Sequence, residues 1–148
     1  MNLRLSILEG ASLSFNRTTK PFMQTCGFND DWWVGTAKRP VVFCSITTDP
    51  EGEVARAQIR PHSPLGAAYP TYMRSRRDWT EIDLLEVRAD LRDLGFGHAV
   101  VGRLLPEFPS PCIAASLNGW SDRFWRSLGW AEHAHPNERG ATLFVQPD

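Results

Sequence analysis

A short loop with two glycines lies between an apolar, strand-like run and an amphipathic run of the chain. Residues 87–98 read Val-Arg-Ala-Asp-Leu-Arg-Asp-Leu-Gly-Phe-Gly-His. The start of a helix leaves backbone N–H groups without intrahelical partners, and the helix dipole favours negative charge there. Gly95 and Gly97 permit a close approach of a ligand, and Arg92 adds a cation. The loop is therefore predicted to bind a phosphate or diphosphate group.

Two common phosphate-binding motifs do not fit this loop. A dinucleotide fingerprint needs a third glycine where Val100 stands, and a P-loop needs Gly-Lys-Ser/Thr. The run from Arg92 to Gly97 instead resembles the Arg/Gln-x-x-Gly-x-Gly/Ala loop of the GNAT superfamily of N-acetyltransferases. Residues 118–130 resemble the second signature of that family, an asparagine followed by a small residue, an aromatic pair and a glycine-aromatic ending. The two blocks together are a stronger signal than either one alone.

The resemblance implies an acyl-CoA site, with acetyl-CoA as the expected co-substrate and no metal. The pantetheine amides pair with the backbone near Val87, and the diphosphate lies on the amides of residues 94–98. Asn118 contacts the pantetheine arm or caps the helix that follows it. The residues expected to bind the cofactor are Val87, Arg88, Arg92, Asp93, Leu94, Gly95, Phe96, Gly97, His98, Asn118 and Trp125.

Acidic residues before this loop are candidates for a catalytic base. A primary amine with a pKa of about 10 is protonated at neutral pH and must lose a proton before it attacks a thioester. Glu81, six residues before Val87, matches the base position of histone-acetylating members of the family, and Asp83 is the second candidate. Glu86 is a weaker third choice. The alternative is that these acids are merely solvated at the end of a strand.

Trp125 departs from the family pattern, because many members have at this position a tyrosine that protonates the departing CoA sulfur. An indole N–H has no comparable acidity. A thiolate with a pKa of about 8.5 is nevertheless a tolerable leaving group, and water can protonate it. Ser121 and Tyr72 are other candidate acids. The missing tyrosine keeps open a second hypothesis, a catalytically silent acyl-CoA binder.

Other constellations of residues carry less chemistry. His133 and His135 follow Glu132, but a third metal ligand is not evident, so a metal site is not expected. Residues 30–33, Asp-Asp-Trp-Trp, form a candidate pocket for a cationic amine.

The loop must be positioned by an α/β fold. Strands are predicted at residues 3–7, 41–47, 53–60, 82–87, 112–116, from 130 onward and 141–145, and helices at 95–105 and 118–129. One or two short helices are expected within 11–40, and an irregular connection at 61–78. The apolar positions of 82–87 change face between Leu84 and Leu85, which a β-bulge explains. We therefore predict a single GNAT-like α/β domain over 1–148, with a mostly antiparallel mixed sheet, a bulged central strand and flanking helices.

Composition limits the partners of such a domain. The formal net charge is −1, from 16 basic and 17 acidic residues, so neither nucleic-acid nor membrane binding is expected. The same charge argues against a third hypothesis, a toxin that acetylates charged tRNA. The three cysteines are widely spaced and fit a cytoplasmic location. The expected acceptor is a small-molecule or peptide amine, and both a monomer and a homodimer remain open.

Overall fold

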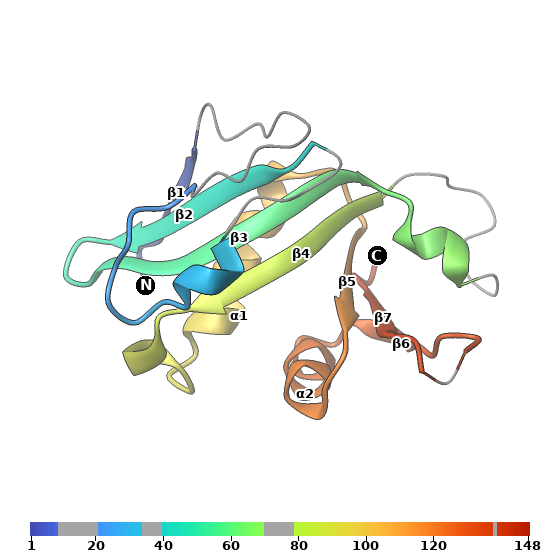
Figure 1. The fold of residues 1–148 in the computed structure, drawn as a ribbon. Coiled ribbons are helices and arrows are strands. Elements are labelled where there is room, and N and C mark those ends of the chain that lie inside the picture. The colour runs from blue at the N-terminus through green and yellow to red at the C-terminus, as the bar shows by residue number, and fades with distance from the viewer. Residues whose placement is uncertain (9–20, 34–39, 70–78, 138) are drawn as a thin grey trace.

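The computed structural model describes residues 1–8, 21–33, 40–69, 79–137 and 139–148. Its strands form one sheet of seven in the order β1-β2-β3-β4-β5-β7-β6 (Figure 1). The strands are β1 Arg4–Ile7, β2 Val42–Thr48, β3 Gly52–Ser63, β4 Trp79–Val87, β5 Cys112–Ser116, β6 Ala131–His133 and β7 Thr142–Val145. All neighbouring strands are antiparallel except β4 and β5, which are parallel. The predicted α/β class with a mostly antiparallel mixed sheet is confirmed.

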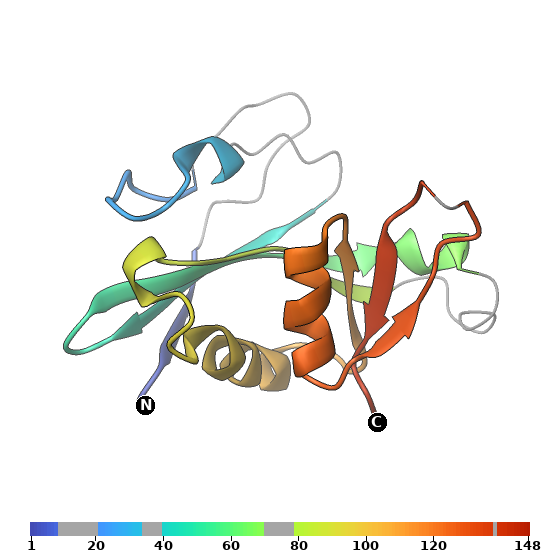
Figure 2. The ribbon, with the colours of Figure 1, turned by 90° about the horizontal axis from the view of Figure 1, so that it is seen from below.

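Two α-helices flank the sheet, α1 Phe96–Leu104 and α2 Gly119–Ser127. Short 3-10 helices are η1 Asp30–Trp33, η2 Leu65–Ala68, η3 Ala89–Leu91 and η4 Leu105–Glu107. Figure 2 shows η1 and α1 on opposite faces of the sheet, with α2 beside the gap between β4 and β5. Within residues 21–33 the predicted early helix is therefore a single short turn.

Both predicted α-helices are confirmed, and their ends follow local chemistry. Gly95 precedes α1 with φ 85°, a left-handed conformation that glycine adopts without strain. Asn118 caps α2, because its side-chain oxygen accepts a hydrogen bond from the Ser121 N–H at 2.9 Å. Gly129, with φ 77°, follows the end of α2.

The predicted bulge lies in β4, but not at the predicted position. Leu84 pairs with Gln58 and Ile82 pairs with Ile59, so Asp83 is the extra residue. The prediction placed the change of face between Leu84 and Leu85, which is wrong by one residue. Burial explains the error, because both faces of β4 are covered and the apolar alternation therefore carries less information there.

The main hydrophobic core lies on the α1 face of the sheet. Ala55, Ala57 and Ile59 of β3 are fully buried there, together with Val100 and Leu104 of α1. The face covered by η1 is different, because Arg56 and Gln58 of β3 are also buried, at 1% and 8% exposure. Residues 21–33 lie over this face of the sheet (Figure 2), where Phe22, Phe28 and Asp30 contact the Arg56 guanidinium.

Candidate active site

Strands β4 and β5 diverge after a short stretch of pairing. Within the described residues they share two registered pairs, Thr80 with Cys112 and Glu81 with Ile113. Beyond these pairs β5 continues along β7, while β4 continues along β3. The backbone of β4 beyond Glu81 therefore has an edge that β5 does not pair with.

Val87 presents its backbone at this open edge. The Arg88 N–H donates to the Val54 carbonyl of β3 at 2.9 Å, and backbone groups of successive strand residues point to opposite edges. The carbonyl of Val87 instead accepts a hydrogen bond from Arg92 Nε at 3.0 Å. The predicted cofactor strand end and the predicted phosphate-loop cation thus lie side by side.

The loop after β4 forms a tight turn into α1. Asp93 and Gly95 both have positive φ, 60° and 85°. The first hydrogen bond of α1 runs from the Ala99 N–H to the Gly95 carbonyl at 3.3 Å, so the N–H groups of Phe96, Gly97 and His98 precede it. Leu94 is 63% exposed and Arg92 is also exposed. The geometry can place an anion at the start of α1.

The two glycines of the loop have different reasons to be glycine. A Cβ on Gly95 would meet open space, so its conformation alone requires glycine. A Cβ on Gly97 would lie 2.8 Å from Cε2 of Phe124, so Gly97 permits the close contact of α1 with α2. His98 also faces α2, where its Nε2 lies 2.8 Å from Ser127 Oγ. The Nε2 atom of His98 is therefore engaged by α2, while its backbone N–H lies at the start of α1.

The side chain of Arg88 is engaged away from the loop. Its guanidinium donates to the carbonyls of Glu51 and Glu53 at 2.7 and 2.9 Å, and it pairs with Asp90. These contacts give the Arg88 side chain a structural role between β4 and the β2–β3 turn, and its predicted contact with the cofactor stays a prediction.

Trp125 lies in the core and not at the surface of α2. It is 4% exposed, and its ring centroid is 4.8 Å from that of Trp130 and 5.0 Å from that of Phe124. Trp125 therefore packs among aromatic rings of the core, and its predicted contact with the cofactor stays a prediction. Asn118 is engaged as the helix cap, the second of its two predicted roles.

Glu81 lies at the last residue pair before β4 and β5 diverge. It is 7% exposed, and its carboxylate accepts a hydrogen bond from Ser63 Oγ at 2.5 Å and lies 3.8 Å from Arg60 Nε. Burial raises the pKa of Glu81, the Ser63 hydrogen bond opposes this shift, nearby Asp83 adds to it, and Arg60 opposes it. A carboxylate with a raised pKa is a stronger base than an ordinary glutamate.

Asp83, the bulged residue, shares a cation with Glu81. Its Oδ2 accepts hydrogen bonds from Gln58 Nε2 at 2.6 Å and Arg60 Nη2 at 2.8 Å. Arg60 thus bridges the two predicted base candidates. The site residues predicted from the sequence do not include Gln58, Arg60 or Ser63, although the alternation of polar residues along β3 indicated a polar face.

Tyr69 also lies near Glu81 and is not among the residues predicted from the sequence. It is 1% exposed, and its hydroxyl donates to the carbonyl of Ala141. Burial, and secondarily Glu81, raises the pKa of Tyr69, which makes it a poor acid. The other candidate tyrosine, Tyr72, lies outside the described residues.

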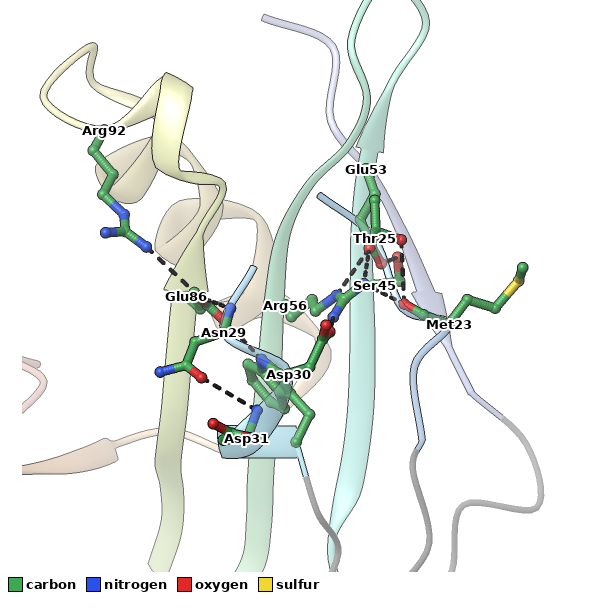
Figure 3. Close-up of polar contacts among 11 residues, drawn as sticks. Met23, Thr25, Asn29, Asp30, Asp31, Ser45, Glu53, Arg56, Glu86 and Arg92 are labelled. Carbon is green, nitrogen blue, oxygen red and sulfur yellow. Dashed lines mark hydrogen bonds and ion pairs between the residues drawn. The ribbon is translucent and has the colours of Figure 1, made fainter. Parts of the chain in front are cut away.

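Glu86 contacts two segments of the chain, residues 29–33 and the loop that carries Arg92, and Figure 3 shows Asn29 and Arg92 approaching it. Its carboxylate accepts hydrogen bonds from the Asn29 N–H and from Trp33 Nε1, both at 2.6 Å. Arg92 Nη2 lies 3.6 Å from the same carboxylate, which is 3% exposed. These contacts favour a structural role for Glu86 over its weak candidacy as a base.

The predicted aromatic pocket is only partly assembled. Trp33 and Asp30 line a pocket of about 50 Å³ together with Phe22, Gln24 and Arg56. Trp32 is 51% exposed and is not part of its lining. The pocket also contains a cation, because the Arg56 guanidinium lies 4.7 Å from the Phe22 ring centroid and 3.7 Å from Asp30 (Figure 3). The Arg56 guanidinium therefore already occupies the position beside Asp30 that the predicted pocket offered to a cationic amine.

Two further sequence predictions concern metals and thiols. In the described ranges, no three His, Cys, Asp or Glu side chains gather as metal ligands. Burial raises the pKa of the Cys44 thiol to about 12 and that of Cys112 to about 11, while Cys26 is exposed. No helix among the described residues is long and apolar enough to cross a membrane.

Comparison with known proteins identifies the fold through structure and not through sequence. Neither a family model nor a curated protein sequence matches this chain. The structure of AtaTR bound with AcCoA is similar at a TM-score of 0.61, with 15% identity over 98% of this chain and 92% of that one. AtaT complexed with acetyl-methionyl-tRNAfMet has a TM-score of 0.59, with 15% identity over 99% and 95% of the two chains. NAA60 of Arabidopsis thaliana in complex with acetyl-CoA has a TM-score of 0.51, with 10% identity over 98% of each chain. The chain has a GNAT-like fold.

Proposed function

We propose that residues 1–148 act as one domain that transfers an acetyl group from acetyl-CoA to a primary amine. The observation that carries the proposal is the divergence of β4 from β5 directly before the anion loop at the start of α1. The similarity of the fold to structures that contain acetyl-CoA supports this choice of co-substrate. Three free cysteines fit a reducing compartment, so we place the reaction in the cytoplasm.

The cofactor would be held by backbone groups and one cation. The N–H groups of Phe96, Gly97 and His98 bind the diphosphate, and Arg92 adds a charge-assisted contact. The pantetheine arm pairs with the open edge of β4 near Val87. This arrangement brings the thioester toward the bulge at Asp83.

The chemistry is direct attack within a ternary complex. Glu81 accepts a proton from the ammonium group, directly or through water, and the free amine attacks the thioester carbonyl carbon. A C–N bond forms and the C–S bond breaks, and the second proton of the attacking nitrogen passes through water to the leaving CoA thiolate. A backbone N–H near Val87 stabilises the oxyanion of the tetrahedral intermediate.

The proposed acceptor is a small-molecule or peptide amine. A second acceptor class is the α-amino group of an aminoacyl-tRNA, because the fold matches AtaT complexed with acetyl-methionyl-tRNAfMet over 99% of this chain. The net charge of −1 argues against this class, since nucleic-acid binding depends on neutralising phosphates. Thiol release measured with charged tRNA and with a panel of amines distinguishes the two.

The cofactor site is tested by a glycine substitution and a matched control. Gly95→Val should abolish acetyl-CoA binding in calorimetry without unfolding the protein, because a side chain there crowds the anion and strains the turn. Gly129→Val is the control, since Gly129 also has positive φ and open space around it but lies at the far end of α2. Equal acetyl-CoA affinity in the Gly95→Val protein and the unmodified protein would remove the cofactor site from this loop.

Turnover decides between enzyme and binder. Acetyl-CoA binding together with amine-dependent thiol release supports the transferase. Tight binding with no thiol release in the presence of any acceptor would favour the catalytically silent module, which the buried Trp125 in place of the family tyrosine makes a real alternative.

A further inference from the structure

Glu86 lies between two segments of the candidate site. One is residues 27–33, which we call the acceptor-side segment, and the other is the loop 92–98, which is proposed to bind the cofactor diphosphate. Its two carboxylate oxygens accept the Asn29 N–H and the Trp33 Nε1–H, one each, and both donors belong to the segment over the sheet. Arg92, the cation of the anion loop, lies 3.6 Å from one of these oxygens. Figure 3 shows Arg92 and Asn29 reaching Glu86 from different elements. One buried carboxylate thus contacts both halves of the candidate site.

A second set of contacts joins the same two elements. The Ala89 N–H donates to the Gly27 carbonyl at 2.9 Å. Gly27 packs so closely on Arg88 that a Cβ there would lie 2.6 Å from Arg88 Cγ. The acceptor-side segment is therefore attached at two points to the strand end and loop that carry the cofactor residues.

No other described cation competes for Glu86 at close range. Arg56 is in register with Glu86 on β3, but its guanidinium contacts Glu53, the Met23 carbonyl and Asp30. Arg92 is the cation within 4 Å of Glu86 among the described residues. A buried carboxylate is costly unless donors surround it, so Glu86 holds Arg92 more strongly when it has fewer other donors.

From these contacts we infer that Glu86 is a positioning residue that couples diphosphate binding to docking of the acceptor-side segment 27–33. The inference rests on the proposed function, because it needs Arg92 to bind the acyl-CoA diphosphate. When Asn29 and Trp33 donate to Glu86, the carboxylate stays satisfied and Arg92 can turn to the diphosphate. By linkage, a bound diphosphate that takes Arg92 strengthens the docking of the segment. The acceptor-side segment, already docked in this structure, is thus held more firmly when the cofactor is bound.

Trp33→Phe tests the coupling, because it removes one donor to Glu86 and keeps an aromatic ring in place. Calorimetry should show CoA binding weakened by about 3- to 10-fold in this variant. Trp32→Phe is the matched control, since Trp32 is exposed and donates no hydrogen bond to Glu86 within the described residues, and it should leave the CoA Kd unchanged.

Pantetheine, which lacks the diphosphate, separates this coupling from a general loss of structure. Trp33→Phe should bind pantetheine as well as the unmodified protein does. In a Glu86→Gln background, Trp33→Phe should have no further effect on the CoA Kd, because Arg92 then has no carboxylate to return to. Hydrogen exchange of the Asn29 amide should slow when CoA is added and should not respond to pantetheine.

Two results would overturn the inference in different ways. The coupling would be contradicted if Trp33→Phe and Trp32→Phe bound CoA equally well and the hydrogen exchange of the Asn29 amide did not change when CoA was added. This result would leave the proposed function intact. An unmodified protein that does not bind CoA would remove the proposed function and the coupling with it.

Discussion

The two faces of β3 have the same degree of burial and opposite chemistry. On the α1 face, Ala55, Ala57 and Ile59 pack among apolar side chains at 0% exposure. On the η1 face, Arg56 is 1% exposed, lies between the rings of Phe22 and Phe28, and pairs with Glu53 at 2.8 Å. The first face needs only matching volume, whereas the second needs every charge to find a partner. The difference teaches that alternation along a strand predicts which face is apolar, but does not predict whether the polar face is exposed to solvent.

Arg56→Met tests whether the η1 face is a second core. It should lower the free energy of unfolding by about 3–5 kcal/mol, because it leaves the carboxylates of Glu53 and Asp30 without their guanidinium. Ile59→Ala is the matched change on the other face and should cost about 2–5 kcal/mol. Urea unfolding measures both. A cost below about 1 kcal/mol for Arg56→Met would mean that the polar face contributes little to stability.

Glu81→Gln tests whether the polar face does chemistry. It should lower kcat at neutral pH by about 10²-fold, which is about 2.7 kcal/mol, leave acetyl-CoA affinity nearly unchanged, and recover in part at high pH where the amine deprotonates unaided. Asp83→Asn is the control on the same strand and shares Arg60 with Glu81. A larger loss of kcat in Asp83→Asn than in Glu81→Gln would assign the role of catalytic base to Asp83, the bulged residue.

Gly97→Ala tests how tightly the helical side is packed. The added methyl would lie 2.8 Å from the Phe124 ring, so the free energy of unfolding should fall by about 1–3 kcal/mol. Gly102→Ala in the same helix meets nothing within 4 Å and should stabilise the protein by up to about 1 kcal/mol. Thermal unfolding measures the pair. Equal effects of the two changes would contradict the close contact of α1 with α2.

The pH dependence of stability gives the smallest expected effect. The pKa of Glu81 is raised in the folded state, chiefly by burial, so its stabilising contribution is complete below the ordinary carboxyl pKa and is lost as pH rises through the folded value. Glu81→Gln lacks this loss. Its Tm relative to the unmodified protein should therefore rise as pH increases through that window, and a difference in Tm that stays constant with pH would contradict the raised pKa.

Local sequence alone determined the turn at Gly95 and the ends of both α-helices. Gly95, Asn118 and Gly129 act through their own backbone or through neighbours a few residues away, so their types and spacing were sufficient to predict them. The pair of signatures likewise indicated the GNAT fold, which the structural comparison confirms.

Only the tertiary structure decided what surrounds each acid. Glu81 meets Ser63 across 18 residues, and Glu86 meets Asn29 and Trp33 across 57 and 53 residues, so no local pattern could pair them. Packing also separated the two loop glycines, since an added Cβ on Gly97 would meet Phe124 of another helix, whereas one on Gly95 would meet open space. The burial of Trp125 in the core was likewise not predictable from its place in the second signature. Sequence determines conformations set by neighbouring residues, whereas the environment of a charge depends on which distant segments cover it.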